Sequence, residues 1–222
     1  MNYRIQDISQ ELPRNPAGYP RRRALGVVAF MPHHFGAWGG TAEWAAEIHL
    51  GKWETAGGIA YGWFIPEEDN DVIYYCHSIE EKGYHCGGGG MNSKAMSCCV
   101  AGNFEERPPK PWQIDKLVWL IIHTNDRDNL QRLIVWHNDH RPTACPGRYF
   151  PKEEVIRRVT EHYRQREEEQ EEQEPEEPPQ PPRDTLPGEP PTTPEPTPPA
   201  PPTGCVGAIL LIVALATAIT LT

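Results

Sequence analysis

Hydrophobic positions in residues 1–166 follow two spacings, which together predict a mixed sheet flanked by helices. Short apolar runs are typical of buried strands, whereas apolar residues three and four apart are typical of helices packed on one face. The expected strands are residues 24–31, 58–65, 71–79, 95–104 and 132–137, and the expected helices are 41–53, 111–126 and 151–167. The alternation predicts an α/β (α+β mixed) fold in one domain, residues 1–166.

Local signals support two of the expected helices. Thr41 stands where an N-cap residue is expected, directly before the helix at 42–53. Pro111 stands at the start of the next helix, where proline is favoured. One face of that helix is apolar through Ile114, Leu117, Val118, Ile121 and Ile122.

The pattern ends after residue 166. Residues 167–203 hold 11 acidic residues against the single Arg183, and 14 of the 25 prolines. Such a segment cannot bury an apolar core, so we expect a disordered, self-repelling linker. This segment accounts for the whole net charge of -10, and residues 1–166 are balanced, with 20 charges of each sign. Without a basic face, nucleic-acid binding is not expected.

The last residues, 204–222, form a second distinct segment. Residues 205–222 contain 18 residues without a charge, which as a helix would extend about 27 Å at 1.5 Å per residue. We expect a transmembrane anchor, the alternative being an apolar helix that packs on a partner. The first 23 residues lack the apolar core of an ordinary secretory signal. The six cysteines form no CxxC pair, and we expect most of them to be buried free thiols.

The loop "HNDHRPTACPG" at 137–147 holds the strongest candidates for chemistry. His137 and Cys145 are eight residues apart, and an imidazole and a thiolate are good zinc ligands. Two ligands do not make a site, and a third is expected from His33-His34 at the end of the first predicted strand. Two histidines and one cysteine would leave one zinc position open, as in catalytic zinc sites.

Four segments in order resemble the type 2 N-acetylmuramoyl-L-alanine amidase family, which includes phage endolysins and peptidoglycan recognition proteins. They are "VVAFMPHH", "GIAYGWFI", "NSKAMSCCVAGNF" and "WHNDHRPTACPG". The resemblance covers roughly residues 24–160 and leaves the linker and tail outside. It implies a zinc hydrolase that cuts the amide bond between N-acetylmuramic acid and the L-alanine of the stem peptide in peptidoglycan.

Carried over by position, the resemblance implies that Zn²⁺ is bound by His33, His137 and Cys145. Tyr61 would orient water or donate to the developing oxyanion, and Thr143 would add a second hydrogen bond. Many family members place a general-base glutamate where this chain has Cys99. The proton carrier therefore stays open between Tyr61, His34 and a more distant glutamate.

Two other functions fit the same residues. A non-catalytic module of the same fold would bind cell-wall fragments without a working metal, and a structural zinc site would need four protein ligands. For the enzyme we expect a monomer, held in a membrane by its C-terminal helix and acting on the cell wall. That membrane would be the host inner membrane if the gene is carried by a phage.

Overall fold

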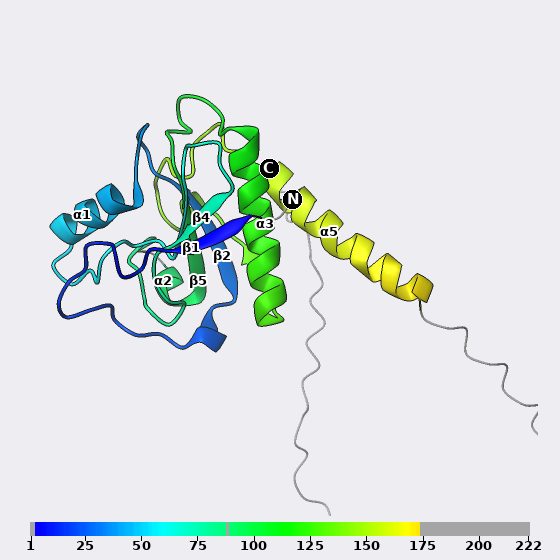
Figure 1. The fold of residues 1–222 in the computed structure, drawn as a ribbon, viewed down its shortest axis with the longest axis horizontal. Coiled ribbons are helices and arrows are strands. Elements are labelled where there is room, and N and C mark those ends of the chain that lie inside the picture. Colours follow the sequence, from blue (N-terminus) through cyan, green and yellow to red (C-terminus); the bar gives the residue numbers. More distant parts are fainter. Residues whose placement is uncertain (1–2, 88, 174–222) are drawn as a thin grey trace, which may run out of the picture. The chain divides into compact units, whose positions relative to one another are not determined.

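The computed structural model describes residues 3–87 and 89–173. These residues form a six-stranded mixed sheet with helices on both faces (Figure 1), as the apolar pattern predicted. The strands are β1 (Arg4–Asp7), β2 (Ala29–His34), β3 (Trp63–Ile65), β4 (Val72–Tyr75), β5 (Ala95–Val100) and β6 (Leu133–Ile134). The helices are α1 (Ala42–Lys52), α2 (Met91–Lys94), α3 (Pro111–Asp128), α4 (His137–His140) and α5 (Lys152–Gln173), with a 3-10 turn η1 (Ala24–Gly26).

The sheet has the order β1-β4-β3-β5-β2-β6. Only β3 and β4 pair antiparallel, and the other neighbours are parallel. The central strands β2 and β5 are buried along their whole length, as expected of parallel strands covered on both faces. Parallel strands that begin at the same edge also end at the same edge, so the ends of β2 and β5 lie together.

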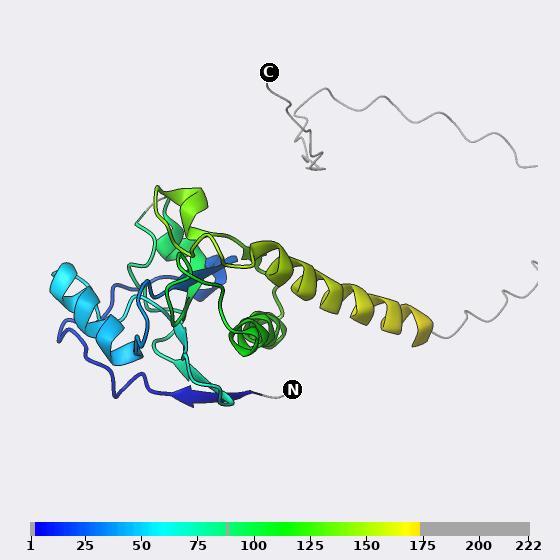
Figure 2. The same cartoon turned by 90° about the horizontal axis from the view of Figure 1, so that it is seen from above.

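The two faces of the sheet are covered by different helices (Figures 1 and 2). The larger core packs α3 and α5 against one face, with Phe30, Cys98 and Leu117 among its fully buried side chains. On the other face, α1 contributes Ala42, Ala45 and Ala46 to a smaller core that also holds Phe64 and Cys99. The small alanine side chains let α1 approach the sheet closely. Its larger residues Trp44 and Ile48 are 42% exposed.

The predicted caps are confirmed. The side chain of Thr41 accepts a hydrogen bond from the backbone of Trp44 at 3.1 Å, and Pro111 occupies the first turn of α3. All five predicted strands are shorter in the structure than expected. Residues 24–26 form η1 rather than a strand, and β3 begins only at Trp63. At 58–59 the backbone turns instead toward Tyr19, whose hydroxyl donates to the Ile59 carbonyl at 2.8 Å.

The C-terminal helix is longer than the sequence predicted. α5 continues to Gln173, past residue 167, where the linker was expected to begin. Glutamate and glutamine favour helix, and an Arg164–Glu168 ion pair one turn apart adds support. Within the described ranges no helix is long and apolar enough to cross a membrane. The predicted anchor at 204–222 and linker residues 174–203 lie outside those ranges.

Candidate metal centre and catalytic cleft

The side chains of His33, His137 and Cys145 come together at one end of the sheet. One potential ligand atom from each lies within 4.8 Å of the others. The Cys145 Sγ is 3.4 Å from the His33 Nδ1, and the rings of His33 and His137 are 4.7 Å apart between centroids. His33 is 1% exposed and Cys145 is 8% exposed. The structure therefore assembles the three residues that the sequence proposed as zinc ligands.

Each of the three residues is placed by a different segment of the chain. His33 is near the end of β2 and pairs in register with Cys99 of β5. The backbone N–H of Val135 donates to Phe30 at 3.0 Å, which extends the pairing of β6 and carries the chain to His137 at the start of α4. The loop after α4 then returns Cys145 to His33.

Gly147 fixes the Cys145 loop against the neighbouring turn. It has φ +108°, and an added Cβ would lie 2.5 Å from the backbone of Phe104. Only glycine allows this combination of backbone angle and close approach. Two residues later the Tyr149 N–H donates to the Phe104 carbonyl at 2.9 Å, which completes the contact.

The donor set fits a zinc ion. Zinc is commonly bound by imidazole nitrogens and thiolate sulfur, and three protein donors leave a fourth position for reactants. The Nδ1 of His137 is buried without a hydrogen-bond partner. A buried nitrogen with an unused lone pair is costly unless something binds it. This unpaired nitrogen, on a residue that converges with His33 and Cys145, is the structural observation that favours a metal.

Burial controls the protonation of these groups. Burial lowers the pKa of His33 well below its usual range, with His85 and His137 adding to the effect. Burial also lowers the pKa of His137, so both rings are neutral near pH 7, as metal ligation requires. Burial raises the pKa of the Cys145 thiol to about 12 in the metal-free chain. A metal that binds Cys145 as thiolate would therefore displace a proton.

A cavity of about 410 Å³ adjoins the cluster. Tyr61 and Thr143 both line it, as does His137. The Tyr61 ring is 5.2 Å from the His33 ring, and burial raises the pKa of its hydroxyl well above the usual range, with Cys99 and Cys145 contributing. The hydroxyl thus stays protonated and can donate a hydrogen bond. The Thr143 Oγ1 accepts from the Cys145 N–H at 3.3 Å and keeps its own proton to donate.

His34 is directed away from the cluster, as expected for neighbours on a strand. Its Nδ1 accepts from the Phe104 N–H at 3.2 Å, so it supports the turn after β5. Cys99 lies beside His33 on the cavity side of the sheet, at the position where the resemblance expected a glutamate. Burial raises the pKa of its thiol well above the usual range, so it is not a base at neutral pH. Among the described cavity-lining residues, none is Asp or Glu.

The structure adds His49 to the cavity, which the sequence analysis did not single out. Its Nδ1 accepts from the Ala60 N–H at 2.9 Å, so the neutral ring carries its proton on Nε2. Burial lowers the pKa of His49 to about 4. The ring stacks on Trp53 at 5.4 Å and meets the edge of Tyr61 at 5.2 Å. The only sequence signal was its position on a helix directly before the Tyr61 segment.

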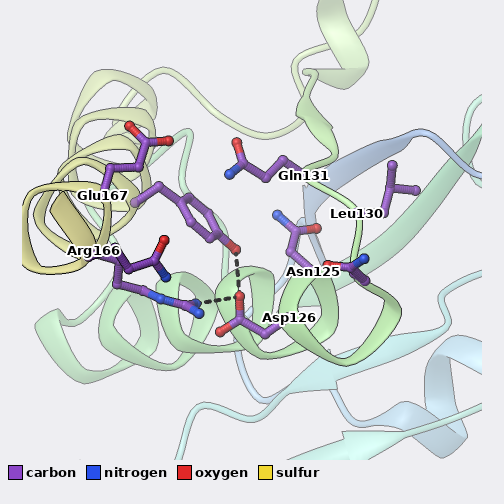
Figure 3. A pocket seen from close by; sticks show the side chains of 9 residues that line it. Asn125, Asp126, Leu130, Gln131, Arg166 and Glu167 are labelled. Atoms are coloured by element: carbon purple, nitrogen blue, oxygen red, sulfur yellow. Dashed lines mark hydrogen bonds and ion pairs between the residues drawn. The ribbon is translucent and has the colours of Figure 1, made fainter. Parts of the chain in front are cut away.

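A second pocket, of about 390 Å³, lies between the end of α3 and α5 (Figure 3). Its polar groups pair with one another. Arg166 forms an ion pair with Asp126 at 2.8 Å, and the Tyr163 hydroxyl donates a hydrogen bond to the same carboxylate at 3.3 Å. It contains none of the three clustered residues, so the cavity beside Tyr61 is the candidate site.

Comparison with known proteins agrees with this geometry. The family model described as N-acetylmuramoyl-L-alanine amidase matches residues 25–148. The chain belongs to the type 2 N-acetylmuramoyl-L-alanine amidase family. The matched range includes all three clustered ligands, Tyr61 and Thr143. A search of curated proteins found no match.

Solved structures share the fold. One is the endolysin N-acetylmuramoyl-L-alanine amidase LysCS from Clostridium intestinale URNW, with 25% identity, TM-score 0.60, and coverage of 72% of this chain and 97% of the other. The Ph2119 endolysin from the Thermus scotoductus MAT2119 bacteriophage Ph2119 has 17% identity, TM-score 0.59, and coverage of 70% and 99%. Peptidoglycan recognition protein-LE in complex with tracheal cytotoxin has 16% identity, TM-score 0.58, and coverage of 67% and 91%.

Proposed function

We propose that this protein is a zinc-dependent amidase that hydrolyses the bond between N-acetylmuramic acid and L-alanine in peptidoglycan, as a phage endolysin or another cell-wall lytic enzyme. The observation that carries the proposal is the convergence of His33, His137 and Cys145 beside a cavity, with the His137 Nδ1 buried and unpaired. Membership of the amidase family supports the same reaction.

The residues around the cavity have complementary roles in this reaction. Zinc held by His33, His137 and Cys145 would act as a Lewis acid on the amide carbonyl and activate water near pH 7. The Tyr61 hydroxyl, kept protonated by burial, donates a hydrogen bond toward the reacting group. The Thr143 hydroxyl accepts a hydrogen bond from the Cys145 N–H, lines the same cavity and offers a second donor.

The charge of the cavity favours an anionic substrate. Lys52 and Arg141 line it, and its described lining includes no acidic side chain. This distribution is local, because residues 1–166 as a whole carry no net charge. Muropeptide stems carry carboxylates, which pair well with a guanidinium. Trp53 and Tyr84 add aromatic surface for the sugar or the peptide.

The test compares the full chain with its Cys145→Ser variant. We expect about one zinc per wild-type chain and the appearance of free L-alanine amino termini from purified peptidoglycan, without new reducing sugar ends. Both zinc and activity should be lost in Cys145→Ser. The control is Cys76→Ser, which changes a buried thiol outside the cluster and should keep both. Zinc-loaded protein that releases no amino termini would contradict the enzymatic proposal.

A recognition module is the second candidate. The similarity to peptidoglycan recognition protein-LE in complex with a peptidoglycan fragment favours it, although at this identity the likeness concerns the fold. The same experiment separates the two candidates. A recognition module would bind peptidoglycan without zinc and without release of amino termini, and Cys145→Ser would bind as well as the wild type.

We also propose that residues 204–222 anchor the protein in a membrane and that the proline-rich segment before them is a spacer. The support is the 18-residue stretch without a charge. The full chain should float with phospholipid vesicles, whereas a chain ending at residue 203 should stay in the dense fractions. Equal flotation of the two chains would contradict the anchor.

A further inference from the structure

His85 and Cys86 lie outside the ligand cluster, and each contacts one of its two histidines. The His33 Nε2 is 3.1 Å from the Nδ1 of His85. The His137 Nε2 is 3.3 Å from the backbone carbonyl of Cys86. Each clustered histidine therefore has one ring nitrogen engaged by the His85-Cys86 segment and the other free to face Cys145 or a metal.

The His137 contact determines its tautomer. A carbonyl oxygen can only accept, so the His137 Nε2 must carry the proton that bonds Cys86. The lone pair of the neutral ring is then on Nδ1, the atom that is buried without a partner. The Cys86 carbonyl therefore leaves the Nδ1 lone pair of His137 available to bind a metal.

The His33 contact has the same consequence. The His33 Nδ1 is the nitrogen near Cys145, at 3.4 Å from Sγ. If this nitrogen keeps its lone pair, Nε2 carries the proton and donates it to the Nδ1 of His85. His85 then carries its own proton on Nε2, a buried nitrogen without a hydrogen-bond partner among the described residues. The two rings meet at 82°, edge toward face.

The segment is held firmly enough to orient its neighbours. The Asn92 Oδ1 accepts from the Cys86 N–H at 2.8 Å and from the Gly87 N–H at 3.4 Å. Arg22 donates to the carbonyls of Asn92 at 2.8 Å and Ala95 at 2.7 Å, which fixes α2 and the start of β5. His85 is 6% exposed and Cys86 is 1% exposed.

We infer that His85 and the Cys86 carbonyl hydrogen-bond the Nε2 atoms of the two metal-binding histidines. These bonds leave the Nδ1 lone pairs of His33 and His137 to bind the metal. His85 is thus a positioning residue, and Asn92 holds it in place through the backbone of Cys86. A fourth-ligand role for His85 does not fit, because its Nδ1 faces the His33 ring and it is not part of the described ligand cluster. Groups that orient ligand histidines in this way contribute about 10–100-fold to metal affinity.

The inference rests on the proposed zinc site, so the experiment has a readout that needs no metal. Ring ¹⁵N chemical shifts of the full chain, freed of metal by a chelator, report which nitrogen of His33 is protonated. We expect protonation on Nε2 in the wild type and a mixture of tautomers in His85→Leu. His85→Asn should restore the wild-type shifts, because the amide oxygen lies near the position of Nδ1 and can accept the same proton.

Zinc affinity is the second readout. His85→Leu should bind zinc about 10–100-fold more weakly than the wild type, and His85→Asn should recover most of the loss. His77→Leu is the matched control, a buried histidine that hydrogen-bonds the Ser78 carbonyl instead of the cluster, and its zinc affinity should be unchanged.

The two readouts separate the inference from the proposed function. A His33 ring protonated on Nδ1 in the wild type, or full zinc affinity in His85→Leu, would overturn the role of His85. A wild-type chain that binds no zinc but shows the expected tautomer change would refute the zinc proposal and support His85 as the residue that orients His33.

Discussion

Replacing Tyr61 should lower catalysis without changing metal binding. Its ring lies against His33 and its buried hydroxyl is a donor at neutral pH, yet it is not among the clustered ligands. Tyr61→Phe should keep zinc affinity and lower kcat by about 10²–10³, the usual cost of losing one oxyanion donor. Muropeptide release under saturating substrate measures this. Tyr84→Phe, in the same cavity, should retain kcat within about threefold, and an unchanged kcat in Tyr61→Phe would remove Tyr61 from the reaction.

For individual residues, the sequence was most informative within recognisable motifs. The spacing of His137 and Cys145 and the His33-His34 pair at a strand end predicted three residues that the structure brings together. His49 was not singled out from the sequence, and the contact of His85 with His33 was not predicted, because such contacts form only when separate segments pack together. His85 is 52 positions from His33, and only the packed structure shows their 3.1 Å contact.

At the scale of secondary structure, predictions succeeded where an element carries its own signals. α1 and α3 begin at a cap and a proline that the sequence displays, and β5 is a continuous apolar run. β1 was missed because three of its four residues are polar and it exists through pairing with β4. The order of the strands in the sheet could likewise not be predicted from the sequence, because it depends on contacts between distant segments.

Arg132, directly before β6, joins the end of α3 to the segment before β2 and should be costly to remove. Its buried guanidinium donates to the Val27 carbonyl at 3.0 Å and the Thr124 carbonyl at 3.3 Å, and it pairs with Asp128 at the end of α3. Arg132→Met should lower the free energy of unfolding by about 2–4 kcal/mol, because these buried acceptors lose their donor.

Urea unfolding of the full chain measures the effect, with Arg157→Met as its control. The Arg157 side chain is 66% exposed and pairs with Glu154 on the surface of α5. Its replacement should change the free energy of unfolding by no more than about 0.5 kcal/mol. If the two variants are equally stable, Arg132 does not hold α3 to the start of β2 as the structure indicates.

At the scale of the whole molecule, charge is distributed unevenly along the chain. The acidic residues of 167–203 carry the entire net charge, and those up to residue 173 lie on α5. Residues 1–166 are balanced and contain several buried histidines. The net charge therefore comes from the residues after 166, and we expect the response of the fold to mild acid to depend on buried histidines.

Mild acid should destabilise the fold through His49 and His77. Burial lowers the pKa of each to about 4, against 6.5 for a free histidine. Between these values the unfolded chain binds protons that the folded chain does not, so the free energy of unfolding rises with pH. The stabilisation is complete above about pH 6.5 and is lost progressively as the pH falls toward 4.

Urea unfolding of the full chain at pH 7, 6 and 5, with a chelator present, measures this slope. His77→Asn should reduce it by up to about 1.4 kcal/mol per pH unit, the effect of one proton. Asparagine can keep the hydrogen bond that the His77 Nδ1 makes to the Ser78 carbonyl at 3.0 Å, so the variant removes the titrating ring without removing that contact. An equal slope in wild type and His77→Asn would show that His77 is protonated as easily in the folded chain as in the unfolded one.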